Sequence, residues 1–175
     1  MNIIVAVDKK WGIGKNNGLL FKLPSDMAFF RKKTTDKVVA MGSNTLKSFP
    51  GGKPLKNRTN VVLYPDGEKR DDCIVVDDAK QLFEVLDGYD SQDVFVIGGA
   101  MFYAFMLDYC DTAYVTKVDA DGGAQVFFPN LDENKNWRLV QESQPQQDGE
   151  YSITFCTYKN DNPKNFNDGR KRLWV

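Results

Sequence analysis

Three nearly continuous apolar runs constrain the fold of this chain more than any other feature, and they occupy residues 2–8, 37–42 and 93–97. A run without polar alternation is typical of a strand that is buried on both faces of a sheet. Helical and turn-rich segments separate the runs, so the strands are expected to lie parallel and to be joined by crossovers. The sequence therefore predicts an α/β fold with a central, mostly parallel sheet.

The remaining segments complete this prediction. Further strands are expected at 58–63, 73–76 and 113–119, and helices at 24–33, 43–49, 77–86 and 100–106. Residues 137–142 and 151–158 alternate with a period of two and favour an antiparallel pair, with 144–149 as its turn. We expect a mixed sheet of about eight strands with an antiparallel C-terminal edge and about four flanking helices. This domain is expected to cover residues 1–159, with a polar tail at 160–175.

Histidine is absent from the 175 residues, and this excludes several classes of catalytic site. Ser-His-Asp and Cys-His mechanisms and histidine-ligated metals all need an imidazole. Three cysteines are too few for an all-cysteine zinc site, so no metal site is expected. Any catalysis has to use carboxylates, hydroxyls, Lys, Arg, water or a bound organic cofactor.

Charge and cysteine content indicate the surroundings of the protein. The net charge is −1 and no long basic run occurs, so neither nucleic acid nor a membrane is expected as a partner. Cys73, Cys110 and Cys156 are scattered along the sequence, as is typical of reduced thiols in a cytoplasmic protein.

Asp26 is the leading candidate for a catalytic acid. It lies in the first turn of the helix predicted at 24–33, with Leu23, Met27 and Phe30 three or four residues away or adjacent. Burial beside this apolar face would raise its pKa and allow it to hold or relay a proton near neutral pH. The alternative is an ordinary acidic residue that is favoured by the helix dipole.

Two glycine-containing segments are candidates for ligand contact. Residues 9–18 contain three glycines and two asparagines, which predict an irregular, mobile loop over the end of the first strand; a plain surface loop is the alternative. Gly98 and Gly99 separate the run at 93–97 from a helix, so backbone N–H groups can approach a diphosphate there. A tight turn without a ligand would also use glycine.

Two further groups have both a binding and a structural interpretation. Gly42, Ser43 and Thr45 offer backbone and hydroxyl donors to a phosphate, although Ser43 can also simply cap the helix at 43–49. Arg58 can clamp a carboxylate with two parallel hydrogen bonds, or it can be a solvated residue at a strand start.

Several separated motifs together resemble the dihydrofolate reductase family, of the bacterial, single-domain type. They are Ala6-Val7-Asp8, Ile13-Gly14, Leu23-Pro24-Ser25-Asp26-Met27 with Phe30, Val39-Ala40-Met41-Gly42 with Thr45, Pro54-Leu55 with Arg58-Thr59-Asn60-Val61-Val62-Leu63, Val96-Ile97-Gly98-Gly99-Ala100 with Tyr103, Val115-Thr116, and Phe128-Pro129. Their order and spacing cover residues 2–158.

The resemblance implies reduction of 7,8-dihydrofolate to 5,6,7,8-tetrahydrofolate by NADPH, with hydride transfer to C6 and protonation of N5. Asp26 matches the family's buried acid, which holds the pterin and promotes N5 protonation. Thr116 matches the residue that supports this carboxylate. Phe21 stands where the family usually has Trp, so it keeps an aromatic wall without the indole N–H.

The resemblance also implies which residues bind the two ligands. Substrate contacts match Ile4, Val5, Ala6, Met27, Phe30, Phe49, Leu55, Arg58 and Ile97. Cofactor contacts match Ala6, Ile13, Gly14, Gly18, Leu19, Gly42, Ser43, Asn44, Thr45, Leu63, Tyr64, Ile97, Gly98, Gly99, Ala100, Met101, Phe102 and Tyr103. Implied partners are dihydrofolate and antifolates such as trimethoprim or methotrexate, and the protein is expected to be a monomer.

Departures from the family pattern leave two points open. Ser43 replaces a common Arg and Tyr64 replaces a hydroxyl or basic group, so the preference for NADPH over NADH is open, with Lys69 or Arg70 as substitute cations. Gln125-Val126 replaces an Asp-Thr pair, so the loop at 9–18 is expected to be held differently.

Two other functions remain as alternatives. One is a reductase of the same fold that acts on a pyrimidine precursor of riboflavin, and the other is a non-catalytic folate- or nucleotide-binding protein. The motif Leu23-Pro24-Ser25-Asp26 and Arg58 argue against the pyrimidine reductase.

Overall fold

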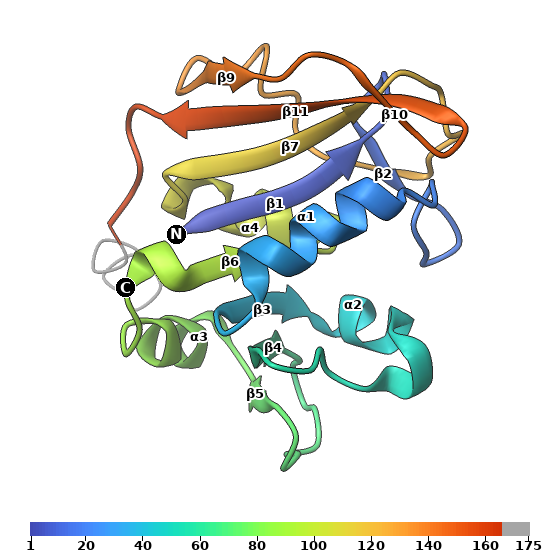
Figure 1. Ribbon diagram of the computed structural model, residues 1–175. Helices are drawn as coiled ribbons and strands as arrows, with labels where there is room; N and C mark the ends of the chain where they lie inside the picture. The colour runs from blue at the N-terminus through green and yellow to red at the C-terminus, as the bar shows by residue number, and fades with distance from the viewer. Residues whose placement is uncertain (166–175) are drawn as a thin grey trace.

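The structure is a computed structural model that describes residues 1–165 (Figure 1). The part of the predicted tail at 166–175 lies outside the described residues. Within residues 1–165, no helix is long and apolar enough to cross a membrane.

A nine-stranded sheet forms the centre of the described chain. Its strands are β1 (Asn2–Val7), β3 (Val38–Gly42), β4 (Thr59–Leu63), β5 (Ile74–Val76), β6 (Val94–Val96), β7 (Thr112–Val118), β9 (Trp137–Glu142), β10 (Gln146–Asp148) and β11 (Tyr151–Asn160). The order is β10-β11-β7-β1-β6-β3-β4-β5, and β9 also pairs with β11. All pairs from β7 to β5 are parallel, whereas β11 is antiparallel to β7, β9 and β10. The predicted mixed sheet with an antiparallel C-terminal edge is confirmed.

Side chains of β1 alternate between two faces, and both faces are buried. Ile3 and Val5 enter one core cluster, and Ile4 enters another. This explains the absence of polar alternation in the run at 2–8, because a central strand has no solvent-facing side.

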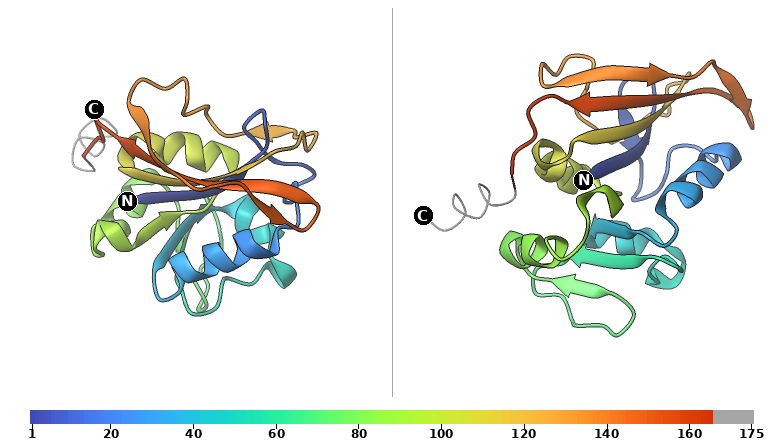
Figure 2. Two further views of the ribbon diagram at one scale, coloured as in Figure 1. Left: turned by 45° about the horizontal axis from the view of Figure 1, so that its top comes forward. Right: turned by 60° about the vertical axis from the view of Figure 1, so that its left-hand side comes forward.

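Four α-helices cover the sheet in the described residues: α1 (Pro24–Thr34), α2 (Ser43–Ser48), α3 (Ala79–Leu86) and α4 (Ala100–Met106). Short 3-10 helices lie at η1 (Pro50–Gly52), η2 (Ser91–Asp93) and η3 (Leu107–Tyr109). Leu82 and Phe102, from α3 and α4, pack in the cluster of Ile3, whereas Phe30 and Leu46, from α1 and α2, pack in the cluster of Ile4. The left view of Figure 2 shows α1 and α4 on opposite faces of the sheet.

The N-termini of α2 and α3 differ in how they are capped. The Asp78 side chain accepts a hydrogen bond from Gln81 N and caps α3. The alternative role considered for Ser43, capping α2, does not occur, because Gly42 occupies the N-cap position and no side chain caps this helix. The Ser43 hydroxyl is therefore not used to close the helix end.

Two segments expected to be irregular contain short strands. Gly12–Gly14 forms β2 and pairs with β8 (Val126–Phe127), and β10 lies inside the predicted turn at 144–149. Glycine and glutamine carry little strand signal, and both strands form because a partner remote in sequence or in a hairpin supplies backbone hydrogen bonds.

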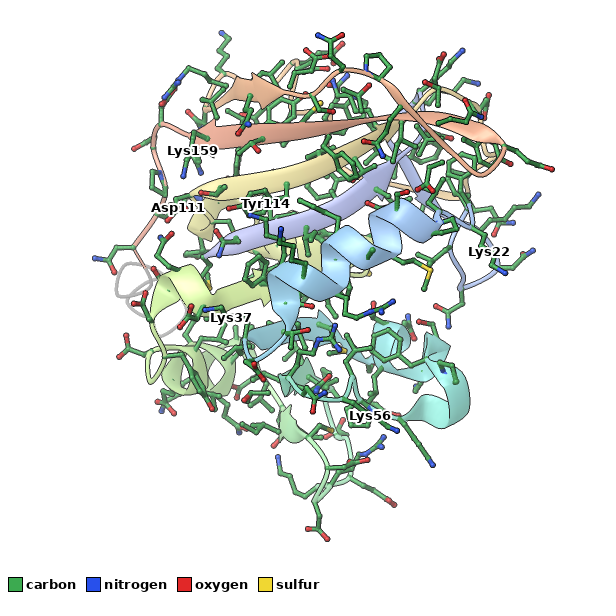
Figure 3. All side chains as sticks on the ribbon, in the orientation of Figure 1. Lys22, Lys37, Lys56, Asp111, Tyr114 and Lys159 are labelled. Atoms are coloured by element: carbon green, nitrogen blue, oxygen red, sulfur yellow. The ribbon has the colours of Figure 1, made fainter. Side chains whose placement is uncertain are left out.

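The end of β11 extends one residue past the predicted domain boundary. Asn160 Nδ2 donates to Cys110 O at 3.0 Å, and Lys164 N donates to Asp108 O at 2.7 Å. Figure 3 shows Asp111 and Lys159 at this edge, where the chain leaves the sheet. Residues 160–164 thus continue the contacts of the domain.

Candidate active site

Asp26 and Thr116 meet at the end of the sheet where the parallel strands finish. Pro24 begins α1, and Asp26 lies in its first turn. Thr116 lies on β7, beside Ala6 of β1 in the register of the sheet. Thr116 Oγ1 donates a hydrogen bond of 2.6 Å to Asp26 Oδ1. Ligands of open α/β sheets bind at this edge, outside the carboxyl ends of the strands.

The pKa of Asp26 is raised above its ordinary value of 3.8. Burial is the main cause, because it disfavours the charged form. The hydrogen bond from Thr116 acts in the opposite direction, and the nearby negative charge of Asp148 raises the pKa further. The direction agrees with the sequence-based expectation, and it allows Asp26 to keep a proton closer to neutral pH.

Asp148 was not predicted as a site residue. Its carboxylate accepts hydrogen bonds from Ser25 N at 2.9 Å and from Asp26 N at 3.1 Å, and it is 3% exposed. It precedes Gly149 in a polar stretch that predicts a turn, and more than 120 residues separate it from Ser25 and Asp26. No local sequence signal could have revealed this contact.

Most residues predicted to contact the substrate rings lie around one cluster beside α1. Its members include Ile4, Phe30, Phe49, Leu55 and Ile97. Among the other predicted substrate residues, Val5 and Met27 lie apart from this group. Val5 packs into the other core cluster, so only its backbone can face the site, and Met27 is 50% exposed on α1.

Ala6, Leu23 and Phe21 belong to a small third cluster that also contains Tyr151 of β11. The Phe21 ring lies 4.7 Å from the Tyr151 ring, centroid to centroid. Phe21 is therefore held against β11, and it gives the site an aromatic side wall without a hydrogen-bond donor.

Arg58 is held in place on two sides. Its Nε donates to Thr34 Oγ1 at 3.1 Å and its Nη1 donates to Lys56 O at 2.7 Å. The guanidinium carbon lies 6.0 Å from the Phe30 ring centroid. Burial and then the neighbouring Arg31 lower its pKa. Arg58 is therefore a fixed cation with the positive charge of Arg31 nearby. This arrangement suits the binding of an anionic group better than the role of a freely solvated residue at a strand start. Arg31 was not predicted as a site residue.

Two glycine corners meet where a cofactor was expected. Gly42 N donates to Gly98 O at 2.8 Å, which joins the end of β3 to the turn between β6 and α4. The peptide bond between Gly98 and Gly99 is cis, and Gly98 has φ of 129°. A Cβ atom on Gly98 would lie 3.2 Å from Thr45 Oγ1 and 3.4 Å from the Tyr103 ring. The corner therefore presents bare backbone and one hydroxyl, which fits the phosphate groups of a dinucleotide.

Tyr103 connects this corner to the central strand. Its hydroxyl donates to Ile4 O at 2.8 Å, and the side chain is buried. Burial and then the charge of Asp26 raise the pKa of its phenol, so it stays protonated. Of its predicted neighbours, Met101 is 88% exposed, while the Phe102 side chain packs in the core, which leaves only the Phe102 backbone for a cofactor.

The loop between β1 and α1 is anchored at several points. The Asp8 carboxylate accepts from Gly12 N at 2.7 Å and from Gly122 N at 3.0 Å. Gln125 Oε1 accepts from Asn16 N at 2.9 Å, and Gln125 N donates to Gly14 O at 2.9 Å. The loop is thus held in part through Gln125, the residue at which the sequence departs from the family pattern.

The tip of this loop approaches the cofactor corner. Lys15 and Gly18 exchange backbone hydrogen bonds, and Asn17 Nδ2 donates to Asn44 O at 3.4 Å. Ile13 and Gly14 lie in β2, and Leu19 is 80% exposed. The loop therefore reaches from the end of β1 to the start of α2.

The two cations suggested as phosphate ligands are both engaged in ion pairs. Lys69 Nζ lies 3.3 Å from Asp77 Oδ2, and Arg70 pairs with Asp72 through two bonds of 2.8 and 2.7 Å. Lys47, which was not predicted, places its Nζ 4.7 Å from the Tyr64 ring centroid. In residues 1–165, no cluster of Cys, Asp or Glu is suited to hold a metal ion.

Comparison with known proteins agrees with this geometry. The sequence profile described as dihydrofolate reductase matches residues 1–160. Dihydrofolate reductase of Bacillus subtilis is 36% identical over 166 residues, which are 93% of this chain and 95% of the relative. The Haemophilus influenzae enzyme is 31% identical over 169 residues, covering 97% and 94% of the two chains. The solved structure of dihydrofolate reductase from Enterococcus faecalis complexed with NADP(H) and RAB-propyl superposes with a TM-score of 0.79 at 30% identity, covering 91% of this chain and 95% of that one. The chain belongs to the dihydrofolate reductase family.

Proposed function

We propose that this protein reduces 7,8-dihydrofolate to 5,6,7,8-tetrahydrofolate with NADPH, and that Asp26 is its key acid. The observation that carries the proposal is the buried Asp26 carboxyl, bonded to Thr116 at the end of the sheet, in a chain that belongs to the dihydrofolate reductase family. A pyrimidine reductase of the same fold or a non-catalytic binding protein has no such support.

The chemistry requires an acid in the pterin pocket. NADPH, when bound, supplies a hydride to C6 of the substrate. Hydride adds readily only when the C6–N5 bond carries a proton on N5, so a group that favours this protonation accelerates the step. Asp26 holds the pterin amino group and N3 and, through its raised pKa, keeps a proton available near neutral pH. Thr116 fixes the orientation of the carboxyl, and Phe21 shields it from bulk water.

Substrate binding is assigned to the apolar wall beside α1. Ile4, Phe30, Phe49, Leu55 and Ile97 pack against the pterin and benzoyl rings, and Met27 is covered when the ligand is present. Arg58 binds the glutamate carboxylate, because its guanidinium is already fixed next to Phe30.

Cofactor binding is assigned to the glycine corners and to the loop at 9–18. The segments 42–45 and 98–103 hold the diphosphate, while Ala6, Ile13, Gly14, Gly18 and Leu19 line the nicotinamide side. Lys47 is the cation for the additional phosphate of NADPH, because Lys69 and Arg70 are paired with carboxylates.

Three further properties complete the proposal. Antifolates such as trimethoprim and methotrexate bind in the Asp26 pocket. The protein acts as a monomer. It resides in the cytoplasm, which fits the three free cysteines.

The test is to mix the purified protein with dihydrofolate and to follow the NADPH absorbance. We expect rapid loss with NADPH, and a large reduction in the Asp26→Asn variant at neutral pH with folate binding largely kept. Methotrexate that shifts the Tm without any turnover would instead indicate the non-catalytic folate-binding protein. Unchanged turnover in Asp26→Asn would refute the role of the acid.

A further inference from the structure

The β10–β11 hairpin supplies the cap of α1 that the helix itself lacks. Leu23 occupies the N-cap position and makes no side-chain cap, so the first N–H groups of α1 need an external acceptor. The Asp148 carboxylate accepts from Ser25 N and Asp26 N, at 2.9 and 3.1 Å. A residue remote in sequence therefore fixes the turn that carries the catalytic acid.

The same hairpin contacts the segment just before α1. The Tyr151 ring lies 4.7 Å from the Phe21 ring, and a Cβ on Gly149 would lie 3.7 Å from Lys22 O. Figure 3 shows Lys22 next to the start of α1, on the side of the sheet where this hairpin turns. Residues 148–151 of the hairpin thus contact residues 21–26 at several positions.

The Asp148 side chain is unusual because its charge is buried without a cation. It is 3% exposed, and no ion pair joins it to a Lys or Arg in the described part of the chain. Backbone N–H groups and the helix dipole provide its stabilisation. Burying a carboxylate costs free energy, and a neutral acceptor such as Ser or Asn would be sufficient to cap a helix. Capping alone therefore does not explain why an acidic residue occupies this position.

Few charged or titratable groups face Asp26 from the elements packed around it. β7 contributes the neutral hydroxyl of Thr116, α4 contributes the protonated phenol of Tyr103, and β10 contributes Asp148. Of these three groups, Asp148 is the one whose negative charge raises the pKa of Asp26.

We propose that Asp148 is a positioning residue for dihydrofolate reduction: its buried carboxylate fixes the first turn of α1, directs Asp26 toward the substrate and makes the acid respond to the β10–β11 hairpin. The inference rests on the proposed function of Asp26. Its consequence is electrostatic as well as geometric, because a negative charge beside Asp26 favours the protonated form. Removing that charge lowers the pKa of Asp26, so turnover should begin to fall at a lower pH than in the wild type.

The experiment compares two variants of the full chain. Asp148→Asn keeps the size and one acceptor oxygen but removes the charge, whereas Asp148→Glu keeps the charge but displaces it by one methylene. For each, kcat and KM for dihydrofolate are measured from pH 5 to 10, and folate binding is followed over the same range by tryptophan fluorescence without NADPH. Asp78→Asn is the matched control, because it removes the charge from the side-chain cap of α3, outside the site, and keeps an acceptor oxygen.

For Asp148→Asn we expect the alkaline limb of the kcat profile and the midpoint of folate binding to move to lower pH, with KM changed less than kcat. Asp148→Glu should lower kcat with the midpoint close to the wild-type value. Asp78→Asn should leave the pH profile unchanged.

Three results decide the matter. A wild-type midpoint and kcat in Asp148→Asn, with only a lowered Tm, would show that Asp148 is merely a helix cap and overturn the proposal. If Asp148→Asn does not fold, a wild-type kcat in Asp148→Glu overturns it equally. If the wild-type protein shows no NADPH-dependent turnover, the proposed function itself fails; the folate-binding midpoint then still decides whether Asp148 controls the protonation of Asp26.

Discussion

Thr116 and Asp26 are joined by a hydrogen bond of 2.6 Å across 90 residues of sequence. Thr116 lies on β7, which is paired on both sides, with β1 and with β11, so the donor is fixed by the centre of the sheet. Asp26 lies at the start of a helix, where its carboxyl is set by α1 and by Asp148. The protonation of the acid is thus balanced between a donor that favours its charged form and two influences, burial and Asp148, that oppose it.

Thr116→Val should move the pH dependence of turnover in the opposite direction from Asp148→Asn. The hydroxyl stabilises the carboxylate, so its removal raises the pKa of Asp26 further, and the alkaline limb should shift to higher pH. The free energy of unfolding at alkaline pH should fall by about 1–3 kcal/mol, since a buried charged acceptor loses its donor. Kinetics from pH 5 to 10 and urea titrations check both effects, and Thr116→Ser should restore the wild-type profile. An unshifted limb in Thr116→Val would contradict the assignment.

Asp26→Asn should make the ligand-free protein more stable at alkaline pH while it removes most of the turnover. Because the folded pKa of Asp26 lies above its ordinary value of 3.8, the folded state binds this proton more tightly than the unfolded chain does. Stability is therefore lost as pH rises from that ordinary value through the folded one, and Asn does not suffer this loss. The Tm of the variant should exceed that of the wild type at pH 8 and approach it at pH 5. A lower Tm of Asp26→Asn at pH 8 would refute a destabilising, buried carboxylate.

The strands and helices could be predicted largely because their signals are local. The uninterrupted apolar character of residues 2–8 requires burial on both faces, and the structure places Ile3 and Ile4 in separate clusters. Asp78 likewise carries its capping signal in its own sequence neighbourhood. Strands β2 and β10 were missed because their residues have weak strand propensity and depend on pairing partners.

The candidate site was predictable only where a residue's role depends on its own segment or on resemblance to the family. Asp26 and Thr116 were named in this way, and the structure brings them together. Asp148, Arg31 and Lys47 were not, because each acquires its position from the tertiary fold. An acidic residue before a glycine predicts a turn, and nothing in the local sequence indicates that its carboxylate binds the backbone of Ser25, 123 residues earlier in the chain.

Gly98→Ala should reduce NADPH binding sharply. Its φ of 129° is unfavourable for any residue with a Cβ, and the new methyl group would lie 3.2 Å from Thr45 Oγ1. Backbone strain alone costs roughly 1–3 kcal/mol. Gly52→Ala is the matched control, since Gly52 has φ of 62° and no atom within 4 Å of the added carbon. Fluorescence titration with NADPH should show a large loss in Gly98→Ala and none in Gly52→Ala, while equal binding in both would contradict a cofactor site at this corner.

Lys47→Ala should weaken the binding of NADPH and leave that of NADH unchanged. Lys47 lies one helical turn after Ser43, on the same face of α2, and its Nζ is 4.7 Å from the Tyr64 ring at the end of β4. It can therefore supply the positive charge that Ser43 lacks, and the loss of one charge-assisted contact corresponds to roughly a tenfold increase in Kd. Lys69→Ala is the control, because Lys69 is paired with Asp77 and should affect neither cofactor. Titrations with 2′,5′-ADP and 5′-AMP isolate the phosphate itself. An equal loss for NADPH and NADH, or a selective loss in Lys69→Ala, would assign the phosphate to another cation.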